Sequence, residues 1–236
     1  MARPTWQFLS LALVSAACSI TFGDLKETSK LESKVEFQMS SNIQVLRVET
    51  FSGVLGVIEA SGSDADAGKL FGASTIWASG NTEEEALARA SEMEWVYTES
   101  GDVGVISMTR PSGGSGSIGG SLNRLKVPLH LKVKLHTSNG NLQITGGFHD
   151  FDLETSNGRI TMQLPDAWNG RGKAKSSNGR IAVRCDGKLT CKVDMKTSNG
   201  NSKVLGPPLS EAEGRGSLHL RTSNGHIVVT HLFDRE

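Results

Sequence analysis

Apolar and polar residues alternate along most of the C-terminal half of this chain of 236 residues. Val133 and Leu135, for example, precede a short polar segment, and Leu142 and Ile144 follow it, with mostly polar residues between them. Successive side chains of an extended chain point to opposite faces, so this period of two predicts strands with one apolar face. Each such unit is therefore expected to be a strand, a turn and a second strand.

The polar segment between the strands is Thr/Ser-Ser-Asn-Gly. It occurs five times, with successive asparagines 18, 21, 21 and 25 residues apart, which indicates a structural repeat. Asn-Gly pairs favour tight turns because both residues adopt positive φ at low cost. The predicted structural turns are Asn139 and Gly140, Asn157 and Gly158, Asn178 and Gly179, Asn199 and Gly200, and Asn224 and Gly225.

Two folds agree with these repeats. A meander of Asn-Gly β-hairpins needs only the Asn-Gly pair and leaves the preceding Thr/Ser and Ser unexplained. In an all-β, single-stranded β-solenoid or β-helix of about 21 residues per coil, equivalent residues stack about 4.8 Å apart. Asparagine amides and Thr/Ser hydroxyls can then each form a hydrogen-bonded ladder. We favour the solenoid, in which chain order places Asn178 centrally and Asn224 at the end, and keep the meander as the alternative.

The chain before the repeats differs in composition. Residues 46–57 match the repeat offsets with Ser52 in place of asparagine, as expected of an atypical end coil. Thr82 and Glu85 form a capping box that opens a helix to about Trp95, and we expect this helix to cover one end or one face of the β-stack. Further strands are predicted at 57–60, 74–78, 95–97, 103–106 and 126–135.

The N-terminus has the features of an export signal. Arg3 precedes the short apolar run 8–14, and small residues lead to Cys18. The position of Cys18 resembles that in a bacterial lipoprotein signal, in which the exposed cysteine is lipidated, although Ser15 stands where leucine is usual. Ordinary cleavage after Ala17 and a retained anchor remain the alternatives. The predicted organisation is a signal peptide at 1–17, a linker at 18–34, an N-terminal β part with the helix at 35–110, a Gly/Ser-rich loop at 111–124 and the repeats at 125–232.

Cysteine content agrees with export. The chain has three cysteines, and two remain once Cys18 is cleaved off or lipidated. An even remainder in an exported chain predicts a disulfide, here between Cys185 and Cys191 across an Asp-Gly bend. Two unpaired thiols are the alternative.

Charge divides the chain into two halves. Residues 1–120 hold 8 basic and 15 acidic side chains, a net charge of −7, and residues 121–236 hold 17 and 10, a net charge of +7. A basic stripe at outward repeat positions can attract anionic polymers, although a simple solvated face is the interpretation we favour. Nucleic acid is a poor candidate, since no aromatic residues interleave with the cations. The stripe residues are Arg159, Lys175, Arg180, Lys196 and Arg221.

Catalytic chemistry finds no support in the repeats. The outward positions lack paired carboxylates, and no two of the six histidines share a strong metal-binding spacing. We therefore expect no catalytic residues, no metal and no cofactor. A polysaccharide hydrolase or lyase on a β-helix is the alternative.

The export signal, the strand-rich N-terminal part with its Glu-rich helix and the serial Thr-Ser-Asn-Gly strands resemble the bacterial "putative adhesin" family of β-solenoid domains of unknown function. The resemblance covers residues 35–232. It implies a β-helical fold and an envelope location. The function expected is an exported, non-catalytic envelope structural or binding module that contacts an anionic polymer or a partner protein. A lipid anchor would tie it to a membrane, and the terminal coils allow end-to-end self-association.

Overall fold

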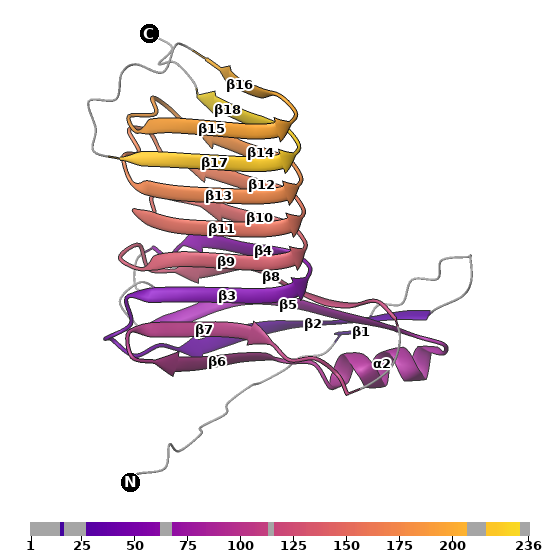
Figure 1. Ribbon diagram of the computed structural model, residues 1–236. Helices are drawn as coiled ribbons and strands as arrows, with labels where there is room; N and C mark the ends of the chain where they lie inside the picture. The colour runs from indigo at the N-terminus through magenta and orange to yellow at the C-terminus, as the bar shows by residue number, and fades with distance from the viewer. Residues whose placement is uncertain (1–14, 17–26, 62–67, 113–115, 207–215, 232–236) are drawn as a thin grey trace.

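The computed structural model of the protein describes residues 15–16, 27–61, 68–112, 116–206 and 216–231. These residues form two large β-sheets and one helix, so the all-β prediction is confirmed (Figure 1). The predicted signal peptide lies almost wholly outside the described residues, as does Cys18. Within the described part of the chain, no helix is both long enough and apolar enough to cross a membrane.

The chain before the repeats contributes to both sheets and forms the helix α2 (Glu83–Ser91). Its strands in the ten-stranded sheet are β1 (Ser15–Ala16), β2 (Glu27–Gln38), β4 (Leu55–Glu59), β5 (Lys69–Gly80) and β8 (Ile118–Val127). Its strands in the eight-stranded sheet are β3 (Val45–Ser52), β6 (Trp95–Ser100) and β7 (Val103–Met108).

Each repeat places its first strand in the eight-stranded sheet and its second strand in the ten-stranded sheet. The alternative of separate hairpins is therefore wrong, because the two strands of a repeat do not pair with each other. The first strands are β9 (Lys132–Asn139), β11 (Asp150–Asn157), β13 (Arg171–Asn178), β15 (Lys192–Asn199) and β17 (Ser217–Asn224). The second strands are β10 (Leu142–Thr145), β12 (Ile160–Leu164), β14 (Ile181–Cys185), β16 (Ser202–Leu205) and β18 (Ile227–His231).

Neighbouring repeats stack in parallel and in register, with Asn157 opposite both Asn139 and Asn178. The alternating apolar residues of both sheets point inward and meet between them, where Leu135, Leu153 and Ile160 are fully buried. This shared core explains the stack, because a single repeat cannot remove its apolar face from water alone. We use the word level for a pair of consecutive strands, one from each sheet, that are joined by a turn at the edge of the stack.

The order of the levels departs from chain order at the upper end in Figure 1. The eight-stranded sheet runs β15-β17-β13-β11-β9-β3-β7-β6, and the ten-stranded sheet runs β1-β2-β5-β8-β4-β10-β12-β14-β18-β16. The last repeat, β17 and β18, is thus inserted between β13/β14 and β15/β16. The expectation that Asn224 ends the stack is wrong, and Asn199 occupies the end.

At the lower end, too, the order of the strands departs from chain order. The level of β3 and β4 lies between β9/β10 and the later strands β7 and β8. The predicted degenerate repeat is confirmed here, since Ser52 pairs in register with Asn139 and Leu55 with Leu142.

Helix α2 packs against β2 and β5 at the lower end (Figure 1). One of the two capping-box bonds forms as predicted, because the Glu85 amide donates to Thr82 Oγ1 at 3.2 Å. The Glu85 carboxylate accepts from the amide of Asn81, at 2.8 Å, and not from that of Thr82. The helix ends at Ser91, earlier than predicted, because Trp95 already begins β6.

Three predicted boundaries are wrong. The linker 18–34 overlaps β2, which begins at Glu27. The Gly/Ser-rich loop 111–124 overlaps β8, where Gly119 and Gly120 allow close packing: a Cβ on them would lie 2.2 Å from Trp77 and 2.1 Å from Met108 Sδ. The predicted strand 126–135 is two strands, because a turn at 128–131 that begins with Pro128 divides it.

Candidate functional site

The turn edge of the stack carries a continuous asparagine ladder, so this prediction is confirmed. Each Nδ2 donates to the Oδ1 of the asparagine on the level below. The bonds run from Asn157 to Asn139 at 2.8 Å, from Asn178 to Asn157 at 2.9 Å, from Asn224 to Asn178 at 2.7 Å and from Asn199 to Asn224 at 2.8 Å. Aligned amides polarise one another, so the ladder makes this exposed edge rigid.

The Thr/Ser hydroxyls do not form the predicted ladder with one another. Four of the five donate instead to a glycine carbonyl of the next level: Thr155 Oγ1 to Gly140 O at 3.0 Å, for example, and Ser176 Oγ to Gly158 O at 3.1 Å. Thr222 and Thr197 bond in the same way. In these four copies the bond satisfies the hydroxyl, which explains the Thr or Ser at the first position of their segments. The hydroxyl of Thr137 is buried and has no such partner among the described residues.

The turn glycines serve close approach and not positive φ, which corrects the sequence argument. None of the repeat Asn or Gly residues lies in the positive-φ region. A Cβ on Gly158 would lie 1.8 Å from the carbonyl oxygen of Gly140, and one on Gly179 would lie 1.9 Å from that of Gly158. Only glycine lets the stacked turns come this close.

The serine at the second position of each segment lies on the outer face of the eight-stranded sheet, next to the ladder. These serines are exposed or half-buried and have no hydrogen-bond partner among the described residues. No internal contact therefore accounts for their repetition. In stacking order they are Ser138, Ser156, Ser177, Ser223 and Ser198.

Charged side chains cover the rest of this outer face in strand-wise bands. Apart from the serine, the outward residues of β11 are all acidic and those of the neighbouring β13 are all basic. Lys175 Nζ donates to Glu154 Oε1 at 2.7 Å, and this hydrogen bond lowers the pKa of the Glu154 carboxyl. Lys132 and Arg171 bind Asp150 from opposite sides at 3.1 and 3.5 Å. The acidic band is thus neutralised by its neighbours.

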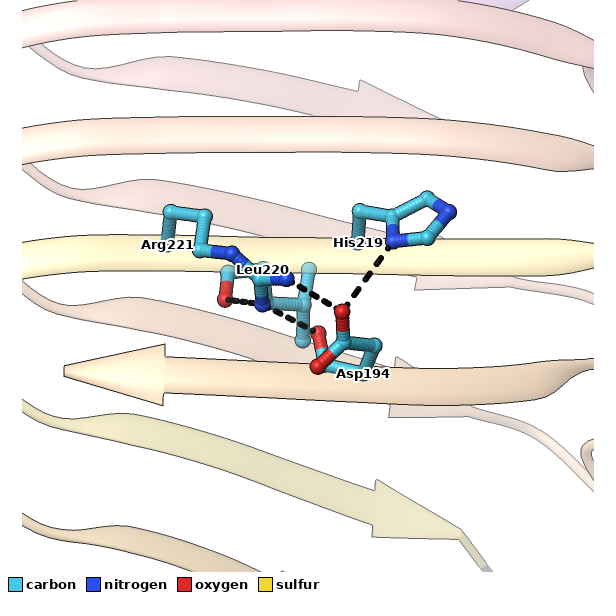
Figure 2. A network of polar contacts seen from close by, with 4 residues as sticks. All are labelled: Asp194, His219, Leu220 and Arg221. Atoms are coloured by element: carbon cyan, nitrogen blue, oxygen red, sulfur yellow. Dashed lines mark hydrogen bonds and ion pairs between the residues drawn. The ribbon is translucent and has the colours of Figure 1, made fainter.

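Above β13 the face is predominantly basic, and its single carboxylate lies within a polar network (Figure 2). Arg221 Nη2 pairs with Asp194 Oδ2, and its Nη1 donates to the carbonyls of Asp194 and Leu220, each at 3.2 Å. His219 Nδ1 lies 3.4 Å from Asp194 Oδ2. The hydrogen bond from Arg221 lowers the pKa of Asp194 and raises that of Arg221.

The predicted basic stripe is divided into two groups by the ladder. Lys175, Arg221 and Lys196 lie side by side on the outer face, since Arg221 is in register with both lysines. Arg159 and Arg180 instead follow the ladder glycines and lie on the turn edge, on adjacent levels. Lys196, Arg159 and Arg180 are exposed and form no ion pair within the described part of the chain.

Three further cations belong to the outer face and were missed in the sequence. Arg171, Lys173 and Lys192 are exposed on β13 and β15. They lie five or seven residues before an asparagine, so the same alternation that predicted the strands could have identified them.

The predicted disulfide is not formed. Cys185 and Cys191 are both free and buried. Cys185 Sγ donates to the Pro165 carbonyl at 3.1 Å, which directs it to the connection after β12. Burial raises the pKa of the Cys185 thiol and raises that of Cys191 to about 12. Both groups are therefore protonated thiols with low nucleophilicity in the folded protein.

Across the residues that the structure describes, no three His, Cys, Asp or Glu side chains gather as metal ligands. The outer face instead combines fixed cations with exposed hydroxyls and amides on a rigid sheet. Such a surface can bind an anionic, hydroxyl-rich ligand by charge and hydrogen bonding.

No family model matches the chain, and no curated protein is significantly similar to it. Among solved structures, the chain resembles a putative cell adhesion protein from Clostridium sporogenes, with 12% identity and a TM-score of 0.53 over 85% of this chain and 99% of that one. A putative adhesin from Bacteroides fragilis aligns with 8% identity and a TM-score of 0.34 over 85% of this chain and 97% of that one. The first likeness shows a shared fold.

Proposed function

We propose that the protein is an exported, non-catalytic binding module of the cell envelope, of the adhesin-like β-solenoid class, and that it contacts an anionic polymer. The observation that carries the proposal is the basic upper part of the outer face on β13, β17 and β15. Its outward cations are Arg171, Lys173, Lys175, Arg221, Lys192 and Lys196, and its outward carboxylate is Asp194.

The geometry suits an extended polyanion. Strands in a sheet lie about 4.8 Å apart, so Lys175, Arg221 and Lys196 form a column of regularly spaced cations along the stack axis. Lys175 and Arg221 each also pair with a carboxylate, whereas Lys196 forms no ion pair within the described part of the chain. A polymer with charges at a similar repeat can meet several cations at once, and the exposed serines next to this column can hydrogen-bond its hydroxyl groups. The summed field of several cations also exceeds that of an isolated pair.

The class and the envelope location rest on two independent supports. Residues 1–18 have the features of an export signal, and the fold is shared with a protein described as a putative cell adhesion protein. Lipidation at Cys18 remains part of this proposal.

No observation favours a hydrolase or lyase. A general acid needs a carboxyl whose pKa is raised, whereas hydrogen bonds from cations lower the pKa of Glu154 and Asp194. Asp150 likewise lies between two cations.

The test compares binding to immobilised dextran sulfate with binding to neutral dextran, at low and high salt. We expect binding to the sulfated polymer alone, weakened by salt because screening shortens the reach of exposed charges. Lys173→Glu with Lys196→Glu should weaken it about tenfold or more, which corresponds to about 1.4 kcal/mol.

Lys30→Glu with Lys34→Glu is the matched control. It changes the net charge equally, on exposed positions of β2 in the other sheet. Equal loss in the two double variants would contradict a site on β13–β15, and equal binding to neutral dextran would contradict recognition by charge.

A further inference from the structure

Among the residues that the structure describes, the upper end of the stack presents two strands with one free edge each. Among the described residues, β15 pairs only with β17 and β16 pairs only with β18. The N–H of Lys192 donates to Gly216 O at 3.1 Å. Since residues of a parallel strand alternate between their two neighbours, the N–H groups of Val193 and Met195 face the free edge.

Packing at this level is incomplete. Val193, Met195 and Val204 are only partly buried, whereas their partners one level below, Leu218, Leu220 and Val229, have no exposed surface. The ladder also ends open, because Asn199 donates to Asn224 and its own Oδ1 accepts no bond from another described residue. The level has the form of one that receives a further strand.

The lower end offers a complementary free edge. Strand β6 pairs only with β7 among the described residues, and it pairs antiparallel. Since β15, β17, β13, β11, β9, β3 and β7 all run parallel, β6 runs opposite to β15. A second copy placed above β15 in the same orientation would therefore add β6 as an antiparallel strand, which a free sheet edge accepts.

Charge distinguishes this arrangement from a two-fold dimer. The upper level carries exposed Lys192, Lys196 and Lys203. At the lower edge, Glu94 directly precedes β6 and is exposed. Glu99 shares the inward face of β6 with Trp95 and Tyr97, and its carboxylate accepts hydrogen bonds from Ser40 and Tyr97. Two upper edges paired antiparallel about Asp194 would place Lys192 opposite Lys196 of the other copy and the two Asp194 carboxylates together. An upper edge placed on a lower edge instead brings these lysines toward Glu94.

We propose that the free edge formed by β15 and β16 binds the lower edge of a second copy of this chain, so that molecules associate head to tail. Such a contact joins two different surfaces and does not close on itself, and the stack therefore continues from one molecule into the next. This contact shares Lys192 and Lys196 with the outer face, whereas the free strand edge and Glu94 belong to the contact alone.

Sedimentation velocity of the purified full chain over a range of concentrations tests the proposal. We expect a series of species that grows with concentration and shrinks at high salt. Val193→Pro, which removes an N–H that faces the free edge, and Lys192→Glu with Lys196→Glu should each give monomers. The control is the double variant Lys134→Glu with Lys173→Glu, whose residues lie in the middle of the stack. It should leave association unchanged, and its Lys173→Glu change should weaken the binding of dextran sulfate.

A mixing experiment guards against a trivial loss of folding. Lys192→Glu with Lys196→Glu reverses the upper edge, and Glu94→Lys reverses the lower edge of another sample. Each variant alone should stay monomeric, and a mixture of the two should associate because glutamates then face lysines. A wild-type monomer at all concentrations, a dimer that does not grow, or failure of the mixture to associate would overturn the proposal.

Discussion

The repeat levels and the N-terminal levels achieve the same stacking by different means. In the repeats, identical turns rest on one another through the asparagine ladder and through glycines that touch backbone, as Gly158 touches Gly140. Below Asn139 the ladder stops at Ser52. Gly53 still lies against the Gly120 backbone, but large side chains now also fill the turn edge, where Gly119 packs against Trp77 and Gly120 against Met108. One geometry can thus be specified by a repeated segment or by individual large side chains, and the two solutions should tolerate change differently.

The largest difference is expected for alanine at a stacked glycine. In Gly158→Ala the new Cβ would lie 1.8 Å from a backbone oxygen, which cannot move without breaking the stack. In Gly120→Ala it would meet the Met108 thioether at 2.1 Å, which can change rotamer. We expect losses in the free energy of unfolding of about 3 kcal/mol or more and of about 1 kcal/mol, respectively. Denaturant titrations measure both, and equal losses would show that the two regions do not differ.

The asparagine ladder gives the next effect. Asn224 bonds to neighbours on both sides and Asn199 to one. At about 1 kcal/mol net per amide bond, Asn224→Ala should cost about 2 kcal/mol and Asn199→Ala about 1 kcal/mol. Ser223→Ala, in the same turn and without a bond among the described residues, is the control and should stay within about 0.5 kcal/mol. A smaller loss of unfolding free energy for Asn224→Ala than for Asn199→Ala would instead indicate that the repeats stack in chain order.

The smallest effect concerns the charged face, which the N-terminal levels lack in this banded form. Hydrogen bonding from Lys175 lowers the pKa of Glu154 below its ordinary value of 4.5. The carboxylate therefore contributes stability above that value, and this contribution is lost as pH falls through the lower folded pKa. Because the pair is exposed, we expect a few tenths of a kcal/mol at most. Stability measured at neutral and acidic pH should depend less on pH in Glu154→Gln than in the wild type.

Sequence predicted the levels well and their order poorly, for one physical reason. Alternation and the Asn offset define which residues face inward, and they locate even the degenerate level at Ser52. Because all repeats share this alternation and offset, the edge of any repeat can pair with that of any other. The sequence of a single repeat therefore does not indicate that β17 lies on β13. The pattern also could not show which side of the ladder a cation occupies, and Arg159 and Lys175 were therefore joined in one stripe.

Glycine was misread for a related reason. In residues 111–124 it suggested a loop, yet Gly119 and Gly120 belong to a strand and make room for Trp77 and Met108. Close approach and freedom of motion call for the same residue, and only the neighbours distinguish them.

The inserted last level separates the order of synthesis from the order of assembly. A chain made from its N-terminus completes β15 and β16 before β17 and β18 exist, and β13 and β14 then offer the early repeat an edge of the same register. The fourth repeat must either wait unpaired or dock one level too low and later be released. Folding of the upper end is thus tied to the last residues of the chain, and a nascent protein cannot complete this end one repeat at a time.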